Sequence, residues 1–380
     1  MADITVTFFN NLDDGTLKVN WSMGSTEVFY HISFTRLQDR SNEVRSALQA
    51  MVDAGRDKTY DKYDELVRKL ATNGNKFYDA LLFGEKADDK VEATRARNWI
   101  AKHFRPGQDA VTFRLPSRIH FPWGLIYDQP VKDGDDPDEL KKHFWCAKFS
   151  ATVHYFVNRF EWTENPWPTE KFGLLFGADQ DLWTATSLEL LAAEKARLLT
   201  LLGMPEPKFK LDDLSKQWRA PQPQIPHGLL TFYCHANGNE LSIGGTTLSA
   251  NDFEEMFEHK TPAIDTSPPT LVFLAGCKTG VSELHKGFFK ATAASGYCGF
   301  IGTEVKVPDI FTLRFVTHFL DRFFSTGESI GQVMNALRMQ HWPLSLVFSM
   351  CCPINLRLEP SAGGMKSDPL NLSNERISTG

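Results

Sequence analysis

The chain has 380 residues, of which 42% are hydrophobic and 23% charged, a composition that excludes a disordered, collagen-like or coiled-coil protein. The formal net charge is −6, from 41 basic and 47 acidic side chains, and no basic run is present, so we expect no nucleic-acid binding. The sequence shows neither a secretion signal nor an apolar run near the roughly 20 residues that span a bilayer. We therefore expect a cytoplasmic protein without membrane insertion.

The six cysteines form no CxxC pair. Their number and spacing indicate neither a zinc site nor a disulfide framework. We expect no metal ion and no organic cofactor, and we expect most of these thiols to be buried.

Residues 1–165 are predicted to form an N-terminal α+β extension that packs on the core. Three short runs of β character (ITVTFF, LKVNW and EVFYHISF) come first, and a helical region follows at about 41–102. Within it, NKFYDALLFG has the spacing of an amphipathic helix, with Gly84 at the expected C-cap. The run VTFRLPSRIHFPWGLIYD then predicts a strand, a turn and a buried aromatic cluster.

Residues 166–360 alternate short apolar runs with helical patterns, which predicts a doubly wound, mainly parallel sheet with helices on both faces. The predicted strands are 172–178, 208–211, 228–236, 270–277, 297–305 and 345–356. The predicted helices are about 187–202, 249–259, 280–295, 309–325 and 329–341. The polar residues 361–380 are expected to form a mobile tail.

Two of the predicted strands end in reactive side chains. The run 228–236 ends in TFYCHANGN, which carries His235, and the run 270–277 ends in LAGCKTG, which carries Cys277. Ligands of open α/β sheets bind at the carboxyl ends of the strands. A single cysteine or histidine at such a place is more often structural, but the two together indicate cysteine-hydrolase chemistry.

The backbone around both residues suits this chemistry. The predicted helix after Cys277 would favour a thiolate at its positive end. The backbone N–H groups of Cys277 and Ala236 are expected to converge on a developing oxyanion. Gly238 and Gly276 flank the two positions, as expected where a substrate approaches the backbone closely.

These motifs resemble the CHAT domain family of caspase-like clan CD cysteine peptidases, which are related to separases and metacaspases. The resemblance rests on HFPWGLIYD, on FYCHANG, on LAGCKTG and above all on GFIGTEVKVPDIFTLRFVTHFLDRFFSTGESIGQVMNALR. It covers about residues 115–358 well. It implies a caspase-like fold for the second part of the chain.

By this resemblance, Cys277 is the nucleophile and His235 is the general base of an endopeptidase that cleaves a protein or peptide substrate. Ala236 stands where the family often has glycine, which keeps the N–H group but adds a methyl group. The resemblance also implies an activating or regulatory protein in a bacterial defence or cell-death pathway. Some relatives need calcium, and the alternative to a metal-free protein is weak calcium binding by the acidic loop 133–139. The alternatives are a catalytically silent scaffold or interaction module, and an acyltransferase or amidohydrolase that acts on small molecules.

Three acidic residues fall at predicted strand ends and are candidates for the substrate pocket: Asp179, Asp181 and Glu304. A carboxylate at Glu304, where relatives commonly carry an apolar residue, favours Arg or Lys in the substrate. The alternative is that Glu304 is solvated or paired with Lys306 or Arg314. No third, orienting residue for the histidine is identifiable from the sequence.

Other candidates are set aside. The run AGCKTG lacks the GxxxxGK[ST] spacing of a phosphate-binding loop. His318 is expected to be structural, Cys234 to pack behind the sheet, and the Cys351–Cys352 pair to be ordinary packing.

Overall fold

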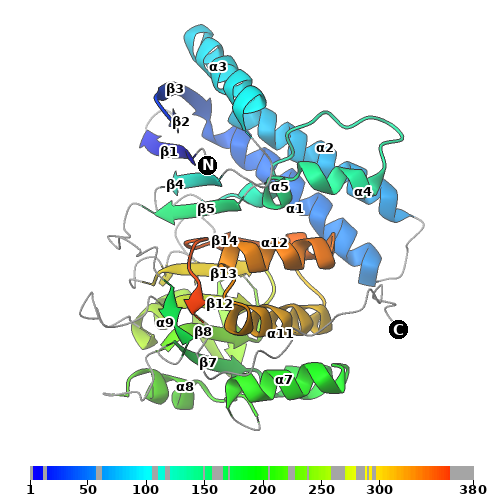
Figure 1. The fold of residues 1–380 in the computed structure, drawn as a ribbon, viewed down its shortest axis with the longest axis vertical. Helices are drawn as coiled ribbons and strands as arrows, with labels where there is room; N and C mark the ends of the chain where they lie inside the picture. Colours follow the sequence, from blue (N-terminus) through cyan, green and yellow to red (C-terminus); the bar gives the residue numbers. More distant parts are fainter. Residues whose placement is uncertain are drawn as a thin grey trace. The chain divides into compact units, whose positions relative to one another are not determined.

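The computed structural model describes residues 3–11, 15–56, 62–104, 110–115, 120–148, 150–155, 166–169, 172–203, 206–220, 227–237, 239–257, 270–279, 287–288, 291–292 and 297–359. The chain divides into two compact units (Figure 1). Unit 1 comprises Met1–Phe156 and Arg338–Ser349, and unit 2 comprises Val157–Leu337 and Met350–Gly380. Residues 338–349 thus group with the first unit, although their sequence pattern falls in the second part. The predicted tail lies outside the described residues.

The described residues of unit 1 form a five-stranded sheet in the order β3-β2-β1-β4-β5. Strands β1 to β3 are antiparallel neighbours, whereas β4 runs parallel to β1 and to β5. Alternate residues of β1 and β2, such as Val6 and Val19, are fully buried on one face of the sheet. The strands are β1 (Asp3–Asn11), β2 (Thr16–Met23), β3 (Thr26–Ser33), β4 (Ala110–Leu115) and β5 (Ser150–Tyr155).

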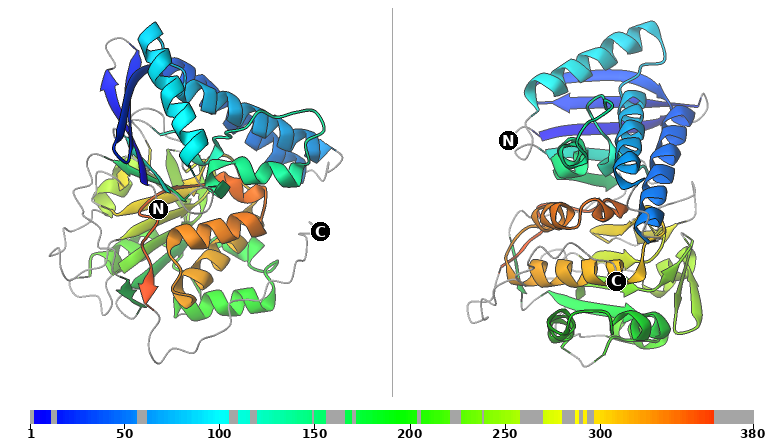
Figure 2. Two further views of the ribbon diagram at one scale, coloured as in Figure 1. Left: turned by 45° about the horizontal axis from the view of Figure 1, so that its top comes forward. Right: turned by 90° about the vertical axis from the view of Figure 1, so that its right-hand side faces the viewer.

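Three long helices follow the first strands: α1 (Phe34–Arg56), α2 (Tyr63–Leu81) and α3 (Ala87–His103). Figure 2 shows α1 and α2 against the same face of this sheet. The prediction of Gly84 as a C-cap is wrong, because α2 ends at Leu81 and Leu82 is its C-cap. Gly84 is required instead by close packing, since a Cβ there would lie 2.1 Å from the backbone of Asp89 at the start of α3.

The predicted aromatic cluster is confirmed. The ring of Trp123 stacks on Phe113 at 4.2 Å between centroids and also contacts Phe8, Phe77 and Phe121. Short elements complete unit 1: η3 (Trp123–Leu125), α4 (Pro137–Leu140), η4 (Lys141–His143), α5 (Trp145–Lys148) and η6 (Leu344–Val347).

The second part of the described chain builds a five-stranded sheet in the order β14-β13-β12-β8-β7. Strand β8 is parallel to β7 and β12, and β12 is parallel to β13. These strands are the continuous apolar runs of the sequence because both faces of the sheet are buried. Their bounds are β7 (Gly173–Ala178), β8 (His227–Tyr233), β12 (Leu271–Ala275), β13 (Gly299–Thr303) and β14 (Phe348–Cys351).

The predicted strand 208–211 is reduced to a single bridge. Lys208 pairs in parallel with Gly177 of β7, and the Ala178 amide donates to the Lys208 carbonyl at 2.9 Å. After β7 the chain first pairs at Lys208 on one side of β7, and it then forms β8 on the other side. The order in which the chain adds strands to the sheet therefore reverses at β7. This reversal is the topological switch point beside which α/β sheets bind their ligands.

Helices cover both faces of this sheet, as predicted, and the remaining strands form two small sheets. The helices are α6 (Gln180–Thr186), α7 (Ala192–Leu202), α8 (Leu211–Trp218), α9 (Ala250–Met256), α11 (Asp309–Ser325) and α12 (Ile330–Gln340). The small sheets combine β9 (His235–Ala236), β10 (Glu240–Ile243) and β11 (Thr246–Ser249), and β6 (Trp167–Pro168) with β15 (Leu358–Glu359). Most of the predicted helix 280–295 lies outside the described residues.

Two successive residues of β8 show how the faces are covered. Phe232 contacts Phe253 of α9, at 5.7 Å between ring centroids. Tyr233 points to the opposite face, where its hydroxyl lies 2.9 Å from Thr186 Oγ1 of α6 and 3.1 Å from the carbonyl oxygen of Asp309 in α11. In Figure 1, α8 and α9 accordingly lie on the other side of the strands from α7 and α11.

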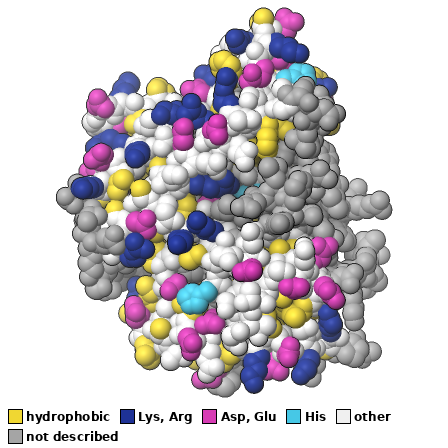
Figure 3. All heavy atoms as spheres, turned by 180° about the vertical axis from the view of Figure 1, so that it is seen from behind, with side chains coloured by type: hydrophobic (Ala, Val, Ile, Leu, Met, Phe, Trp, Pro, Cys, Tyr) yellow, Lys and Arg dark blue, Asp and Glu magenta, His cyan; other side chains and the backbone are white. Residues whose placement is uncertain are grey.

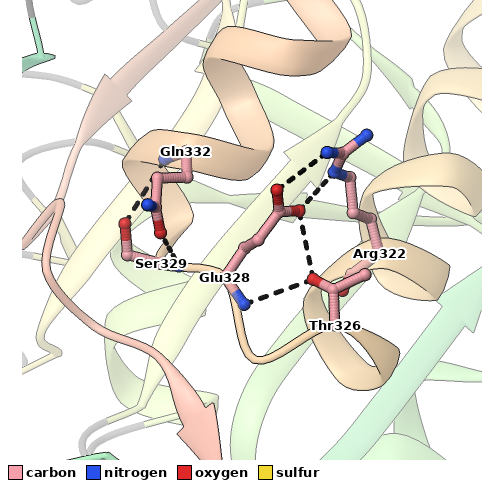
Figure 4. Close-up of polar contacts among 5 residues, drawn as sticks. All are labelled: Arg322, Thr326, Glu328, Ser329 and Gln332. Atoms are coloured by element: carbon pink, nitrogen blue, oxygen red, sulfur yellow. Dashed lines mark hydrogen bonds and ion pairs between the residues drawn. The ribbon is translucent and has the colours of Figure 1, made fainter. Parts of the chain in front are cut away.

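The turn from α11 to α12 is held by side chains of the STGESIGQ run (Figure 4). The Arg322 guanidinium donates two hydrogen bonds to the Glu328 carboxylate, the one from Nη2 at 2.7 Å, and this contact holds the pKa of Glu328 below its usual range. The Thr326 hydroxyl lies 3.1 Å from the same carboxylate. Ser329 and Gln332 bond reciprocally through their amides and side chains and start α12.

On the face shown in Figure 3, lysine and arginine side chains are interspersed with aspartate and glutamate over the described surface. None of the helices within the described residues is long and apolar enough to cross a membrane.

Candidate active site

His235 and Cys277 occupy equivalent positions at the end of the unit 2 sheet. Strands β8 and β12 are parallel neighbours, and Tyr233 pairs with Ala275 in their register. His235 comes two positions after Tyr233, and Cys277 comes two positions after Ala275. Since neighbouring strands lie about 4.8 Å apart, the two residues emerge at the same edge and the same height.

The two turns also touch. A Cβ on Gly276 would lie 2.6 Å from the Cys234 carbonyl oxygen and 2.9 Å from Ala236 Cβ. These two atoms flank His235, so the backbone before Cys277 lies directly against the backbone of the histidine. The absence of a side chain at Gly276 permits this approach. Gly238, the other glycine expected to admit a substrate, lies outside the described residues.

His235 is held on a short strand and is exposed. Strand β9 (His235–Ala236) pairs antiparallel with β10, with Ser242 opposite His235. The half-buried Ala236 follows it. Cys234, which precedes it, is 2% exposed, and burial raises the pKa of its thiol, so Cys234 is a buried thiol as expected.

Cys277 is half-buried, and its Sγ lies 3.8 Å from the Val307 carbonyl oxygen. Burial raises the pKa of the Cys277 thiol; the Asp309 carboxylate raises it further, whereas Lys306 and Lys278 act in the opposite direction. The predicted helix that was expected to lower this pKa lies mostly outside the described residues. In this state Cys277 is a thiol at neutral pH and requires a base to become a nucleophile.

Asp309 is a site residue that the sequence did not single out. It opens α11, and its carbonyl oxygen contacts the hydroxyl of Tyr233, two residues before His235. Burial raises the pKa of its carboxyl, and the charge of His235 opposes this rise. Among the described residues, no hydrogen bond or ion pair engages this carboxylate. The signal available in the sequence was the proline–aspartate turn of VPDIF, which indicated only a helix start.

The three predicted pocket residues differ in their surroundings. Asp179 caps α6: its carboxylate accepts from the Leu182 amide at 3.1 Å and from the Gly244 amide at 3.3 Å. Asp181 lies on α6 and is exposed. Glu304 follows β13 and is only 1% exposed, so it is not solvated. Two of the three carboxylates are thus enclosed by the protein.

The residues set aside in the sequence have structural contacts. His318 Nε2 lies 2.9 Å from a Glu194 carboxylate oxygen, and both side chains are almost fully buried. Cys351 and Cys352 are buried free thiols. Within the described residues, no group of three or more His, Cys, Asp or Glu side chains is arranged to hold a metal ion.

Comparisons with known proteins bear on the fold and on the family. Two solved structures of the Saccharomyces cerevisiae separase–securin complex share the fold, with TM-scores of 0.55 and 0.52 at 12% and 10% identity. Each match covers 94% of this chain but only 30% of the matched chain. The structure therefore has a caspase-like α/β fold.

The family follows from the sequence itself. The sequence pattern of the CHAT domain matches residues 9–342, so the chain belongs to the CHAT domain family. A search of curated protein sequences finds no match.

Proposed function

We propose that the chain is a cysteine endopeptidase that hydrolyses a peptide bond through a dyad of His235 and Cys277. The observation that carries the proposal is the register of β8 and β12, which gives both residues equivalent positions at one sheet edge. Membership of a caspase-like peptidase family supports it. The half-buried thiol and the exposed imidazole suit a nucleophile and its base.

In the proposed reaction, His235 accepts the proton of the Cys277 thiol as the sulfur attacks the carbonyl carbon of the scissile bond. The developing oxyanion is stabilised by the backbone N–H groups of Cys277 and Ala236. His235 then gives its proton to the leaving amine, which departs and leaves a thioester on Cys277. Water attacks the thioester with His235 again as base, and the acid product and the free thiol are released.

A substrate with a basic residue before the cut suits the Asp309 carboxylate, whose charge acts on Cys277. Asp309 supports this preference better than Glu304, because Glu304 is enclosed and the Asp309 carboxylate lies within electrostatic reach of both dyad residues. A guanidinium or ammonium group near Asp309 would also offset the negative charge that raises the pKa of Cys277. Substrate binding would thus favour the thiolate.

Control by a separate protein is part of the proposal. The separases of similar fold were solved in complex with securin, and the raised pKa of the Cys277 thiol is consistent with a resting enzyme. Action in a bacterial defence or cell-death pathway rests on the family resemblance alone.

A peptide-based acyloxymethyl ketone, which alkylates activated cysteines, tests the dyad. We expect it to label Cys277 in the native protein, with the site mapped by mass spectrometry, and to fail after His235→Ala. Cys146→Ala is the matched control, since it removes a buried thiol in unit 1, and it should leave labelling unchanged. Labelling that is indifferent to His235 would support the silent scaffold, an alternative because the family includes inactive members.

A further inference from the structure

A pair of buried threonines lies directly behind the turn that carries Cys277. Thr279 and Thr303 are 1% and 0% exposed. The amide of Thr303 donates to the Thr279 hydroxyl at 3.0 Å, and the amide of Thr279 lies 3.4 Å from the Thr303 hydroxyl oxygen. The amide of each threonine thus faces the hydroxyl of the other, although 24 positions separate them in the sequence. They tie the nucleophile turn to the end of β13.

The hydroxyl protons of this pair point at the carbonyls that precede Cys277. The Thr303 hydroxyl donates to the Gly276 carbonyl oxygen. The Thr279 hydroxyl lies 2.9 Å from the Leu274 carbonyl oxygen and 3.3 Å from that of Gly276. Since Thr279 has a single hydroxyl proton, Thr303 is the principal donor to Gly276.

This contact determines where the Cys277 N–H group points. The Gly276 carbonyl and the Cys277 N–H belong to one peptide unit, which is planar and has the two groups on opposite sides. Holding the carbonyl toward the buried threonines therefore directs the N–H away from them. The next amide, that of Lys278, is already used, because it donates to the Val305 carbonyl at 3.2 Å.

The Cys277 N–H is left for a ligand. It donates to no acceptor among the described residues, whereas most backbone N–H groups in a folded protein have a partner. A hydrogen bond received by the Gly276 carbonyl also polarises the peptide unit, which strengthens its N–H as a donor. The fixed orientation and the stronger polarisation both suit the Cys277 N–H as an oxyanion donor, because such a donor has to point at the oxyanion before the negative charge develops.

We propose that Thr303, supported by Thr279, is a positioning residue that aims the Cys277 N–H at the oxyanion through the Gly276 carbonyl. This inference rests on the proposed peptidase function. It assigns a role in catalysis to two buried residues that do not touch the substrate.

The test compares Thr303→Val, which keeps the shape but removes the hydroxyl, with Thr303→Ser, which restores it. Cleavage of a peptide substrate that depends on Cys277 is followed together with alkylation of Cys277 by iodoacetamide. We expect Thr303→Val to lower kcat by about 10²–10³-fold, the effect of losing one oxyanion donor, with KM and the alkylation rate little changed. Thr303→Ser should recover most of kcat, and Thr279→Val should have a smaller effect.

Three results would overturn the inference. The first is an unchanged kcat in Thr303→Val, and the second is a loss of kcat in Thr303→Ser as large as that in Thr303→Val. The third is a loss of the Cys277 alkylation rate in Thr303→Val that parallels the loss of kcat, which would show that the threonine only maintains the fold. These outcomes are distinct from a failure of the proposed function. In that case the wild-type protein itself would show no cleavage that Cys277→Ala abolishes.

Discussion

Gly276→Ala tests the contact between the two catalytic turns. The new Cβ would lie 2.6 Å from the Cys234 carbonyl oxygen, and ordinary contact begins at 3.4 Å, so this backbone has to move by about 0.8 Å. The displaced atoms flank His235. Overpacking of this kind costs about 1–3 kcal/mol, and a misplacement near 1 Å lowers the rate of a positioned reaction by about 10²-fold. We therefore expect kcat/KM to fall by about 100-fold.

The assay is cleavage of a peptide substrate beside urea unfolding of the same preparations. Gly55→Ala is the matched control, because the nearest atom to its new Cβ is Leu344 Cδ2 at 3.9 Å. Alanine there should leave both the activity and the unfolding free energy nearly unchanged, because Gly55 is the next-to-last residue of α1. Full activity in a stably folded Gly276→Ala protein would refute the reasoning that the two turns are in contact.

Three further predictions concern charge and backbone strain. Asp309→Asn removes a negative charge that raises the pKa of the Cys277 thiol, so iodoacetamide should alkylate Cys277 faster near neutral pH. Cleavage after Arg or Lys should slow, because the substrate's positive charge loses its partner. Equal slowing of alkylation and cleavage would contradict this. Lys278 has a φ of 58°, which costs a non-glycine residue about 1–2 kcal/mol, so Lys278→Gly should raise the unfolding free energy by up to about 1 kcal/mol. The same substitution removes a positive charge that lowers the pKa of the Cys277 thiol, so it should slow alkylation of Cys277. Burial alone would raise the pKa of Glu194, but hydrogen bonds from His318 and the Leu191 amide outweigh it and lower that pKa. The stabilisation is therefore present above the ordinary pKa of a glutamate and is lost as the pH falls through the lowered value. His318→Ala removes one hydrogen bond from the carboxylate, which keeps Arg314 at 3.6 Å. The loss should cost about 1.5–3 kcal/mol and flatten this acid dependence in urea unfolding.

The strands of unit 2 were predictable because burial on both faces leaves continuous apolar runs in the sequence. The run 270–277 became β12 and the run 297–305 became β13 with only shortened ends. The weak strand 208–211 was harder, since only Lys208 pairs with the sheet and α8 begins at Leu211. Gly84 was misread because its reason lies in α3, beyond the reach of a local capping pattern.

The positions of His235 and Cys277 at neighbouring strand ends followed from the sequence, but their electrostatic environment did not. Burial and the Asp309 carboxylate raise the pKa of the Cys277 thiol, and the sequence indicates neither contribution. The influence of Asp309 depends on how α11 is placed against β8. Likewise, nothing local indicates that Thr279 and Thr303 join, because their contact exists only when β12 and β13 are adjacent.

The most direct test of the account is digestion of a diverse peptide library by the purified protein, with cut sites read by mass spectrometry. The wild-type protein should produce cuts, enriched after Arg or Lys, and Cys277→Ala and His235→Ala should abolish them. Cuts that persist in Cys277→Ala would contradict the dyad. A wild-type protein that cuts nothing, alone or with its cellular extract, would contradict the peptidase and favour the scaffold.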